Sequence, residues 1–315
     1  MIVTCPKCGS TNVQRRGYSE DRLKWRYECQ ENHEEFVDEN GYDYRWFRVP
    51  VDMKQEVGKA PKIFFWDIEN SGMLVENVWN LWEPKLNFSQ IKGQPFLLSW
   101  SGKFLYDDTM YSDVVKPSEA KSRDDRRICE SLWKMLDSAD IIVAHNGDSH
   151  DIPKSNSRFL YHGFVPPMYD RSLDTLKIAR SIFDFPSNSL ANINAYLGLE
   201  DKIHNEPGLF DSCVAGNSES LKKLRIYNEQ DVICVESLYL KMRPWIKNHP
   251  NWTIYGESDG NTCPQCGKSG ITWRNDKLNK GIYKVARCNS CGAPIRSRIG
   301  EMTKDKRKNT LYRVS

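Results

Sequence analysis

Residues 62–69 read KIFFWDIE, a short apolar run that ends in acidic residues. This pattern predicts a buried β-strand whose polar end emerges at an edge of the sheet. Side chains two residues apart on a strand point to the same face, so Asp67 and Glu69 should lie side by side. The stretch therefore predicts a strand that presents a pair of carboxylates.

The segments around this strand predict an α/β fold. ADIIVAHN (139–146) is a second apolar run with a polar end, and QPFLLSWSGKFLY (94–106) predicts a β-hairpin that turns at Ser101-Gly102. Amphipathic periodicity and capping residues predict helices over residues 124–136, 151–163, 172–185, 189–198 and 221–245. Strands followed by helices, with an early hairpin, indicate a mixed β-sheet over residues 61–247.

The bulk properties indicate a soluble globular protein of several units. The 315 residues exceed one compact core, and 39% hydrophobic and 28% charged residues are ordinary values for such proteins. No apolar run approaches the ~18 residues of a membrane span. The N-terminus lacks a secretory signal pattern. We therefore expect no membrane association and a cytoplasmic location, in a bacterium or in the host cytoplasm if the protein is viral.

Cysteine pairs at both ends of the chain predict metal sites, because closely spaced cysteines in a non-secreted chain usually bind metal. In residues 250–315, two C-x-x-C pairs separated by 21 residues predict a zinc ribbon with four thiolate ligands: Cys263, Cys266, Cys288 and Cys291. In residues 1–40, a second zinc module would use Cys5, Cys8, Cys29 and His33. The alternative there is a degenerate module without metal. Residues 41–60 lack periodicity and are expected to be a linker.

The C-terminal end is basic, although the net charge of the whole chain is only +3. From Cys263 to Ser315 there are 13 Lys and Arg against 3 Asp and Glu. This balance suits contact with a phosphate backbone, and the alternative is a solvated tail. Aromatic and basic side chains near this zinc module also suit nucleic-acid contact, and docking onto a protein is the alternative: Trp273, Arg274, Tyr283 and Lys284.

Further acids could converge on the pair in KIFFWDIE. Asp151 follows the second buried strand and opens a helix, and Asp231 lies four residues after Tyr227 on one face of a late helix. Each position alone has an ordinary explanation as a strand end, a helix cap or a surface residue. Together they form a cluster of like charges that hard divalent cations would neutralise. Two such ions ~3.5–4 Å apart are the usual arrangement for phosphodiester hydrolysis.

In this order the acids resemble the motifs of DEDD-type 3′–5′ exonucleases. The first motif is Asp67-Ile68-Glu69, the second runs from Asn146 to Asp151, and the third has the Tyr227-x-x-x-Asp231 form of the tyrosine subgroup. The resemblance covers roughly residues 61–245, and the surrounding segments are similar to exonuclease domains of phage and bacterial origin. It implies an RNase H-like mixed sheet with helices on both faces, flanked by the two zinc modules.

The sequence departs from the family pattern in three places. His150 stands where an aromatic residue is common before the acid of the second motif. Asn70 stands where a small hydroxyl residue is common after the first motif. Asp148 is a second candidate for the acid of the second motif, although Asp151 fits the start of the helix better.

The resemblance implies two Mg²⁺ or Mn²⁺ ions and a role for each acid. Asp67 would bridge both ions, Glu69 and Asp231 would hold the ion that activates water, and Asp151 would hold the ion beside the leaving 3′ oxygen. Tyr227 would orient the attacking water.

Other polar residues near these acids are candidates for substrate contact. Asn146 would bind substrate or fix the turn, whereas His145 is expected to be structural. Lys154 and Arg158 lie four residues apart on the helix that Asp151 opens, where they would either contact the nucleic-acid backbone or form a solvated face.

We therefore expect a 3′–5′ exonuclease that releases nucleoside monophosphates, with DNA favoured over RNA as the substrate. A polymerase or a replication or repair protein is an expected partner in trans, because the chain shows no polymerase domain. The alternatives are a structure-specific endonuclease on the same metal site and a non-catalytic adaptor that binds nucleic acid through its zinc modules.

Overall fold

The computed structural model divides the chain into two compact units, Met1–Val57 and Gly58–Ser315. It describes Cys5, Cys8, Asn80 and residues 10–18, 24–31, 46–50, 60–78, 85–203, 205–255 and 260–311. No helix in these parts of the chain is both long enough and apolar enough to cross a membrane.

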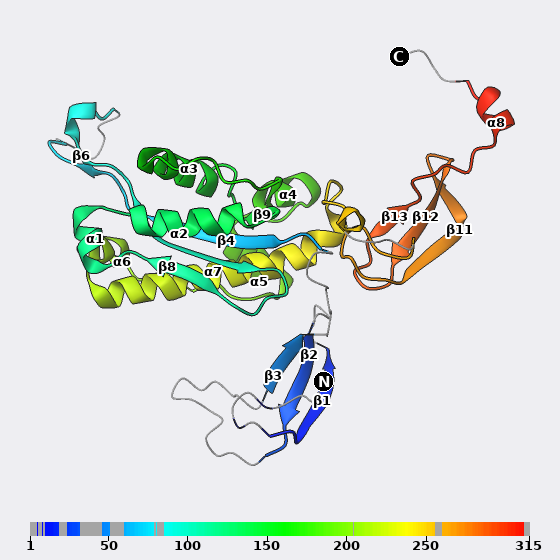
Figure 1. Cartoon of the computed structure of the whole chain (residues 1–315), viewed down its shortest axis with the longest axis horizontal. Coiled ribbons are helices and arrows are strands. Elements are labelled where there is room, and N and C mark those ends of the chain that lie inside the picture. The colour runs from blue at the N-terminus through cyan, green and yellow to red at the C-terminus, as the bar shows by residue number, and fades with distance from the viewer. Residues whose placement is uncertain are drawn as a thin grey trace. The chain divides into compact units, whose positions relative to one another are not determined.

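The larger unit is built on a five-stranded sheet with the strand order β10-β9-β4-β7-β8 (Figure 1). The strands are β4 (Ile63–Asn70), β7 (Leu97–Phe104), β8 (Tyr111–Val114), β9 (Ile141–Ala144) and β10 (Arg171–Asp174). β4 pairs with β9 in parallel and with β7 in antiparallel, so the sheet is mixed and the KIFFWDIE strand lies at its centre. The predicted buried strand over KIFFWDIE and the predicted mixed sheet are both confirmed.

Apolar side chains cover both faces of this sheet. Phe64 and Trp66 of β4 belong to one buried cluster with Leu132 of α2 (Arg126–Asp137). The alternate residue Phe65 belongs to a second cluster with Leu238 of α7 (Ser218–Met242), the long helix in Figure 1. Burial of each large apolar side chain contributes about 1.5–3 kcal/mol, so the two cores together fix β4 in place.

Besides its sheets, the larger unit contains helices shorter than α7, 3-10 turns and one pair of short strands. They are α1 (Pro117–Ser122), α3 (Asp151–His162), α4 (Thr175–Ile182), α5 (Leu190–Leu197), α6 (Leu209–Val214), α8 (Lys304–Lys308), the 3-10 turns η1 (Phe88–Gln90), η2 (Arg243–Trp245) and η3 (Trp252–Ile254), and the pair β5 (Leu74–Val75) and β6 (Ile91–Gly93). As predicted, α3 and α5 each end at a glycine with a left-handed backbone, Gly163 and Gly198.

The helix predicted over 172–185 begins later than expected. Its first residues form β10, which pairs in parallel with β9. The helix starts only after Asp174, whose side chain accepts hydrogen bonds from the backbone N–H groups of Leu176 and Lys177. A side-chain cap of this kind satisfies N–H groups that have no partner inside the helix, and so it sets the boundary.

The turn predicted at Ser101-Gly102 is wrong, because β7 runs straight through these residues. A Cβ atom at Gly102 would lie 2.1 Å from the ring of Phe64 on the neighbouring strand. Gly102 is therefore needed for the packing of Phe64 rather than for a turn. The chain reverses after Phe104 instead, where Tyr106 adopts a left-handed backbone with φ of 67°.

The smaller unit contains an antiparallel sheet with the order β1-β2-β3. Its strands are β1 (Val13–Tyr18), β2 (Lys24–Cys29) and β3 (Trp46–Pro50). β3 lies inside the segment 41–60 that we expected to be a linker, and it pairs with β2 from Glu28 to Lys24. At five residues the strand is too short to give a clear alternating pattern, and pairing with β2 defines it.

The C-terminal part of the larger unit is a three-stranded antiparallel sheet, which we call the C-terminal module. Its strands are β11 (Ile271–Asn279), β12 (Tyr283–Cys288) and β13 (Pro294–Arg296). Trp252 is 3% exposed, its ring centroid lies 6.3 Å from that of Tyr106, and its backbone N–H donates to the carbonyl of Pro264 (2.9 Å). A Cβ at Gly267 would lie 2.4 Å from the same indole ring. Trp252 thus links the module to the core under the central sheet.

We predict that Gly102→Ala destabilises the protein by about 1–3 kcal/mol, because the added methyl group must displace the Phe64 ring from a filled core. Gly72→Ala is the matched control, since no atom lies within 4 Å of a Cβ at that position. It should change the free energy of unfolding by less than about 0.5 kcal/mol. Urea denaturation of both variants measures the difference, and equal stabilities would contradict the assigned role of Gly102.

Candidate active site

Three of the predicted acids meet at one end of β4. Carboxylate oxygens of Asp67, Glu69 and Asp231 all lie within 4.8 Å of one another. Asp67 and Glu69 pair across the sheet with Ser101 and Ser99, and the Ser99 hydroxyl donates to the side-chain carbonyl of Asn228 in α7 (3.3 Å). The two strand carboxylates therefore face the helix that carries Asp231.

Asp151 contacts the same strand from the start of α3. It is 2% exposed at the start of α3, and its Oδ1 accepts a hydrogen bond from the backbone N–H of Ile68 (3.3 Å). Its charge acts on both Asp67 and Glu69. Asp148, the competing candidate, instead accepts a hydrogen bond from Ser172 (2.6 Å) and pairs with Lys177 (2.8 Å). The geometry thus favours Asp151 as the acid of the second motif.

Burial and mutual repulsion make the ionised form of this cluster costly. Desolvation and then the charges of neighbouring acids raise the pKa of Asp67 well above its usual value. Desolvation is also the largest cause that raises the pKa of Glu69 to about 8, the pKa of Asp151 to about 7 and, by direction, the pKa of Asp231. The cluster therefore needs additional positive charge to ionise fully near neutral pH.

Lys202 supplies part of that charge, although no pattern in the sequence points to it. Its Nζ lies 2.7 Å from Oδ2 of Asp231 and 4.9 Å from the centroid of the Tyr227 ring. This cation lowers the pKa values of Glu69 and Asp231 and so partly offsets their burial. Lys202 sits in a loop without periodicity, 29 residues before its partner, so no local pattern could reveal it.

Asn228 is a second residue that the sequence reading missed. Its Nδ2 donates a hydrogen bond to Oδ2 of Asp67 (2.6 Å). Because its side-chain carbonyl is held by Ser99, the amide is fixed in orientation and in turn fixes the Asp67 carboxylate. The asparagine follows Tyr227 directly, but only the packing of α7 on β4 gives it this partner.

The donor set fits hard divalent cations. Oxygen ligands from several carboxylates are what Mg²⁺ and Mn²⁺ prefer. Oδ1 of Asp231 is buried and has no hydrogen-bond partner among the described residues, which is unusual for a carboxylate oxygen. Asp67, Glu69 and Asp231 are the residues that could hold an ion together, and Asp151 contacts β4 at Ile68, between Asp67 and Glu69 in the sequence.

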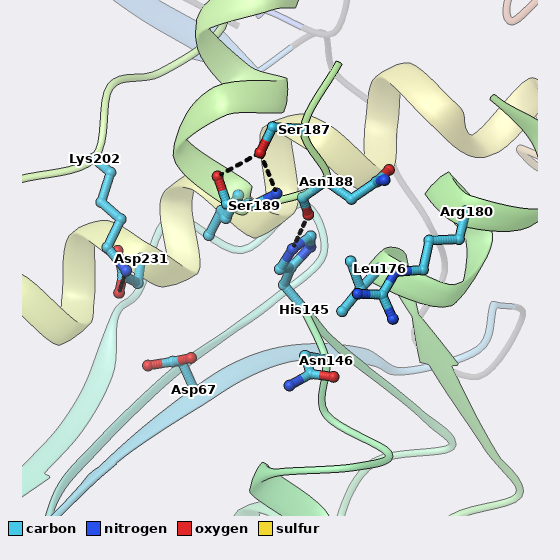
Figure 2. Close-up of a pocket in the computed structure, with 11 residues that line it drawn as sticks. Asp67, His145, Asn146, Leu176, Arg180, Ser187, Asn188, Ser189, Lys202 and Asp231 are labelled. Atoms are coloured by element: carbon cyan, nitrogen blue, oxygen red, sulfur yellow. Dashed lines mark hydrogen bonds and ion pairs between the residues drawn. The ribbon is translucent and has the colours of Figure 1, made fainter. Parts of the chain in front are cut away.

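An open pocket of about 510 Å³ adjoins these acids (Figure 2). Figure 2 shows Asp67 and Asp231 on one side of the pocket and Arg180 with Leu176 on the other. The other lining residues are His145, Asn146, Ser187, Asn188, Ser189, Leu190 and Lys202. The pocket thus joins the acidic cluster to hydroxyl, amide and cationic side chains, which together could bind a polar, anionic group.

His145 and Asn146, the first residue of the second motif, line the pocket. Burial lowers the pKa of His145. Its Nε2 lies 3.0 Å from the carbonyl oxygen of Asn188, and its Nδ1 lies 2.9 Å from the hydroxyl of Thr175. His145 is thus tied to the scaffold. Asn146 has a left-handed backbone with φ of 68°, and its N–H donates to the Asp174 side chain (3.0 Å).

Lys154 lies beside the acidic cluster, as expected from its place on α3. Its Nζ donates to the side-chain oxygen of Asn70 (2.8 Å), the residue after the first motif, and lies 3.2 Å from Nε2 of His150. Two of the three positions at which the sequence departs from the family pattern, Asn70 and His150, therefore contact one lysine. Burial lowers the pKa of Lys154 and nearby acids oppose that change.

Arg158 is turned away from the acids and is engaged in a buried ion pair. Its guanidinium donates to both carboxylate oxygens of Asp125 at 2.6 and 2.8 Å, and the Asp125 side chain is 0% exposed. Asp125 also accepts from the backbone N–H of Leu97 and contacts His162 (2.6 Å). Asp125, Cys129 and His162 could hold a metal ion by distance, but the Arg158 cation already neutralises this carboxylate. Arg158 therefore joins α3 to α2 and β7 instead of facing a substrate.

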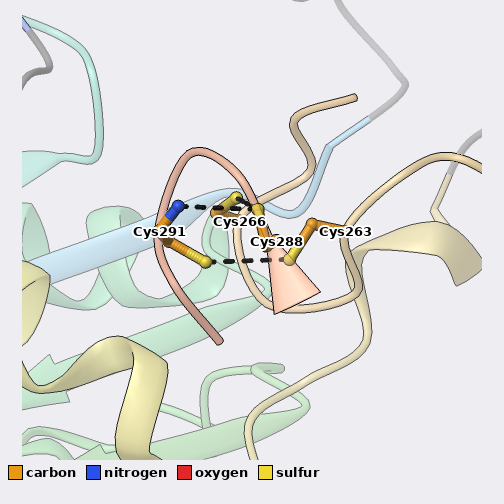
Figure 3. A group of neighbouring side chains, drawn as sticks. All are labelled: Cys263, Cys266, Cys288 and Cys291. Atoms are coloured by element: carbon orange, nitrogen blue, oxygen red, sulfur yellow. Dashed lines mark hydrogen bonds between the residues drawn. The ribbon is translucent and has the colours of Figure 1, made fainter. Parts of the chain in front are cut away.

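The two cysteine sets differ in how far the structure completes them. In the C-terminal module, four sulfur atoms converge (Figure 3), with Cys263 3.7 Å from Cys291 and Cys266 3.8 Å from Cys288. All four lie within 4.8 Å of one another, which fits a closed tetrahedral thiolate site. At the N-terminus, Cys5, Cys8 and Cys29 converge in the same way, and His33 lies outside the described residues. Both clusters could hold a metal ion.

A match to a protein-family model supports the fold. Residues 101–243, a little under half of the chain, match the family model of the RNase H superfamily. A family B DNA polymerase from the hyperthermophilic archaeon Pyrobaculum calidifontis shares 15% sequence identity with a TM-score of 0.43, and the match covers 82% of this chain and 36% of the polymerase. No curated protein matches the sequence. The predicted RNase H-like α/β fold is confirmed, and that fold together with the acidic cluster supports a nuclease.

We predict that Arg158→Ala destabilises the protein by about 3–5 kcal/mol, because the buried Asp125 carboxylate loses its cation. Lys134→Ala removes an exposed ion pair with Glu130, whose two side chains are 65% and 50% exposed, and should cost no more than about 0.5 kcal/mol. Thermal unfolding of the two variants compares them. If the Arg158→Ala protein is stable but binds nucleic acid poorly, the structural role of Arg158 is wrong and Arg158 contacts the substrate instead.

Proposed function

We propose that this protein is a metal-dependent 3′–5′ exonuclease that hydrolyses the terminal phosphodiester bond of a DNA strand and releases nucleoside monophosphates. The observation that carries the proposal is the convergence of Asp67, Glu69 and Asp231, with Asp151 beside them, from β4, α7 and α3. These four acids and Tyr227 form the complete set that the family resemblance requires. A non-catalytic adaptor would have no need of this costly buried charge.

The acids would hold two Mg²⁺ or Mn²⁺ ions, one mainly through Glu69 and Asp231, the other near Asp151, with Asp67 shared between them. Bound there, such ions supply Lewis-acid stabilisation of the phosphate and a lowered pKa for water. Asn228 keeps the Asp67 carboxylate oriented through its 2.6 Å hydrogen bond. Lys202 holds Asp231 and limits the repulsion within the cluster before substrate arrives.

Tyr227 acts as a hydrogen-bond donor rather than as a base. Burial is the largest cause that raises its pKa above the usual tyrosine value, so the phenol keeps its proton at neutral pH. It is 9% exposed and stacks under the Lys202 ammonium, which restricts its position. A fixed neutral phenol next to Asp231 can donate its proton in a hydrogen bond to the oxygen of an attacking water and so align it.

The pocket favours a terminal nucleotide over a continuous duplex. Its volume of about 510 Å³ is that of a small-ligand site, and Leu176 and Leu190 supply apolar side chains to its lining. An exonuclease needs such a pocket for the end of a strand, whereas an endonuclease needs a groove open at both ends.

We retain DNA as the first substrate to test and RNA as the second. A polymerase or repair partner in trans stays a prediction.

The cysteine clusters would each bind one structural Zn²⁺. Modules of this size bury too little apolar surface to fold unaided, so metal binding would supply much of their folding free energy. The four-cysteine set of the C-terminal module would form a closed site, and Cys5, Cys8 and Cys29 would be completed by His33.

We predict that Asp231→Asn lowers the cleavage rate at least about 100-fold, since it removes charge needed to bind and use the ions. Asp148→Asn is the matched control, because this acid pairs with Lys177 and should leave the rate within about twofold. A 5′-labelled single-stranded DNA with Mg²⁺ or Mn²⁺, resolved on a denaturing gel, gives the readout. Shortening from the 3′ end supports the exonuclease, internal cuts indicate the endonuclease, and equal losses in both variants would sink the site assignment.

We predict that the protein without added divalent cations becomes more stable as the pH falls from about 8 to about 5. The pKa of Glu69 is raised to about 8 and that of Asp151 to about 7, so the folded state binds more protons than the unfolded state in this range. Millimolar Mn²⁺ should reverse the trend, because protons and cations compete for the acids. Melting temperatures should differ by at least about 2–4 °C. A melting temperature independent of pH and Mn²⁺ would contradict the charge balance described.

A further inference from the structure

The sheet of the C-terminal module has two chemically different faces. Along β12, Ala286 and Cys288 are buried at 4% and 1% exposure and point toward the cysteine cluster. Because side chains alternate along a strand, Tyr283 and Arg287 point to the opposite face. The register places Val285 beside Arg296 of β13, so Arg296 shares that outer face. We call the outer face of Tyr283, Arg287 and Arg296 the arginine face.

Arg287 and Arg296 are exposed and are held by the module rather than by acids. Arg287 donates to the carbonyl of Gly292 (2.7 Å), and Arg296 donates to that of Ser297 (3.1 Å). Within the described part of the chain, neither guanidinium makes an ion pair. The Arg296 guanidinium carbon also lies 4.3 Å from the centroid of the Tyr283 ring. Each cation is thus fixed in place but keeps unused N–H donors.

The other residues that the sequence suggested for nucleic-acid contact are arranged differently. Arg274 is already paired with Asp276, two residues further along β11. Lys284 points to the opposite side of β12 and pairs with Glu301 at 3.4 Å. Trp273 lies opposite Ala286 in the register and so shares the face of the cysteine cluster. Of the four suggested residues, Tyr283 and, through its register with Val285, Arg274 share the arginine face, and Asp276 already neutralises Arg274.

The geometry of the arginine face fits a single nucleic-acid strand. A guanidinium that stacks on a tyrosine ring leaves its outer plane free, and arginine planes stack on exposed bases. Arg287 is a diagonal cross-strand neighbour of Arg296, at a typical spacing of about 7–8 Å, where it can reach a phosphate of the same strand. From Cys263 to Ser315 there are 13 basic residues and 3 acidic residues, which favours a polyanion as the ligand. A paired duplex would hide the bases that the stacked Arg296 would bind.

We propose that Tyr283, Arg287 and Arg296 form a binding face for single-stranded nucleic acid, outside the pocket that holds the strand end. A base stacks on the Arg296 guanidinium above Tyr283, and Arg287 binds a neighbouring phosphate. The inference rests on the proposed function only for the class of ligand, because the face itself takes no part in hydrolysis.

The test measures binding of the full chain to a fluorescein-labelled 30-nucleotide oligo(dT), with Asp67→Asn in every protein so that the strand stays uncut. Arg287→Ala with Arg296→Ala should weaken binding roughly tenfold. It should also reduce the slope of log affinity against log salt by about 0.7, for the one phosphate contact that Arg287 makes. Lys268→Ala with Lys284→Ala is the matched control, since it removes the same charge from the same module: Lys268 precedes β11, and Lys284 lies on the other face of the sheet.

Equal losses in the two double variants would overturn the inference, because they would show general attraction by a basic module. Unchanged binding in the arginine variant would overturn it as well. Arg296→Lys gives a second test that keeps the charge: it should retain the salt slope but lose the preference for oligo(dT) over an abasic strand of equal length. Tight binding to heparin or polyglutamate without any preference for bases would also count against a stacking site.

The cleavage assay separates this inference from the proposed function. The arginine double variant, with Asp67 restored, should cut a five-nucleotide strand at the unaltered rate, because so short a strand is held by the pocket. If the unaltered protein cleaves DNA but binding does not depend on the arginine face, only the inference is refuted. If binding depends on the arginine face but the unaltered protein shows no metal-dependent cleavage, only the proposed exonuclease activity is refuted. Zinc content and circular dichroism of each variant establish that the module is folded.

Discussion

The repulsion among buried carboxylates is the constraint on which the site depends. Asp67, Glu69 and Asp231 bring their oxygens within 4.8 Å of one another in a setting that raises all three pKa values. Such an arrangement persists only where the surrounding fold holds it and a counter-charge offsets it. The hydrogen bond from Asn228 and the cation of Lys202 meet these two needs in part. Divalent cations would meet the rest, and that requirement links the fold to phosphodiester chemistry.

The alternation of β4 explains why the acids are buried at all. Ile63 and Phe65 belong to the apolar cluster beneath α7, and Asp67 and Glu69 continue the same face of the same strand. The acids therefore stand where an apolar core reaches its edge, with α7 covering them as it covers the core. The burial that makes the charges costly is also what makes their interaction with ions strong. One strand and one helix thus supply both the stability of the sheet and the electrostatics of the site.

The C-terminal module is joined to this core through Trp252, whose ring contacts Tyr106 and fills the space above Gly267. Its sheet directs one face toward the sulfur cluster and leaves the other to solvent. A module too small to fold by apolar burial can place most of its basic side chains on the outside, because a metal rather than a core would stabilise it. The arginine face and the cysteine site are therefore two consequences of the same small size.

The sequence by itself determined the elements and residues that local patterns encode. The apolar runs predicted β4 and β9, and capping residues predicted the ends of α3 and α5. Motif spacing selected the four acids and the cysteine sets as candidate sites. Only the tertiary structure decided the features that need contacts between distant segments. Lys202 reaches Asp231 across 29 residues, Arg158 reaches Asp125 across 33, and Gly102 meets Phe64 across the sheet. Periodicity, capping and motif spacing act over a few residues, whereas charge pairing and close packing act through space, so a pattern in the chain cannot specify them.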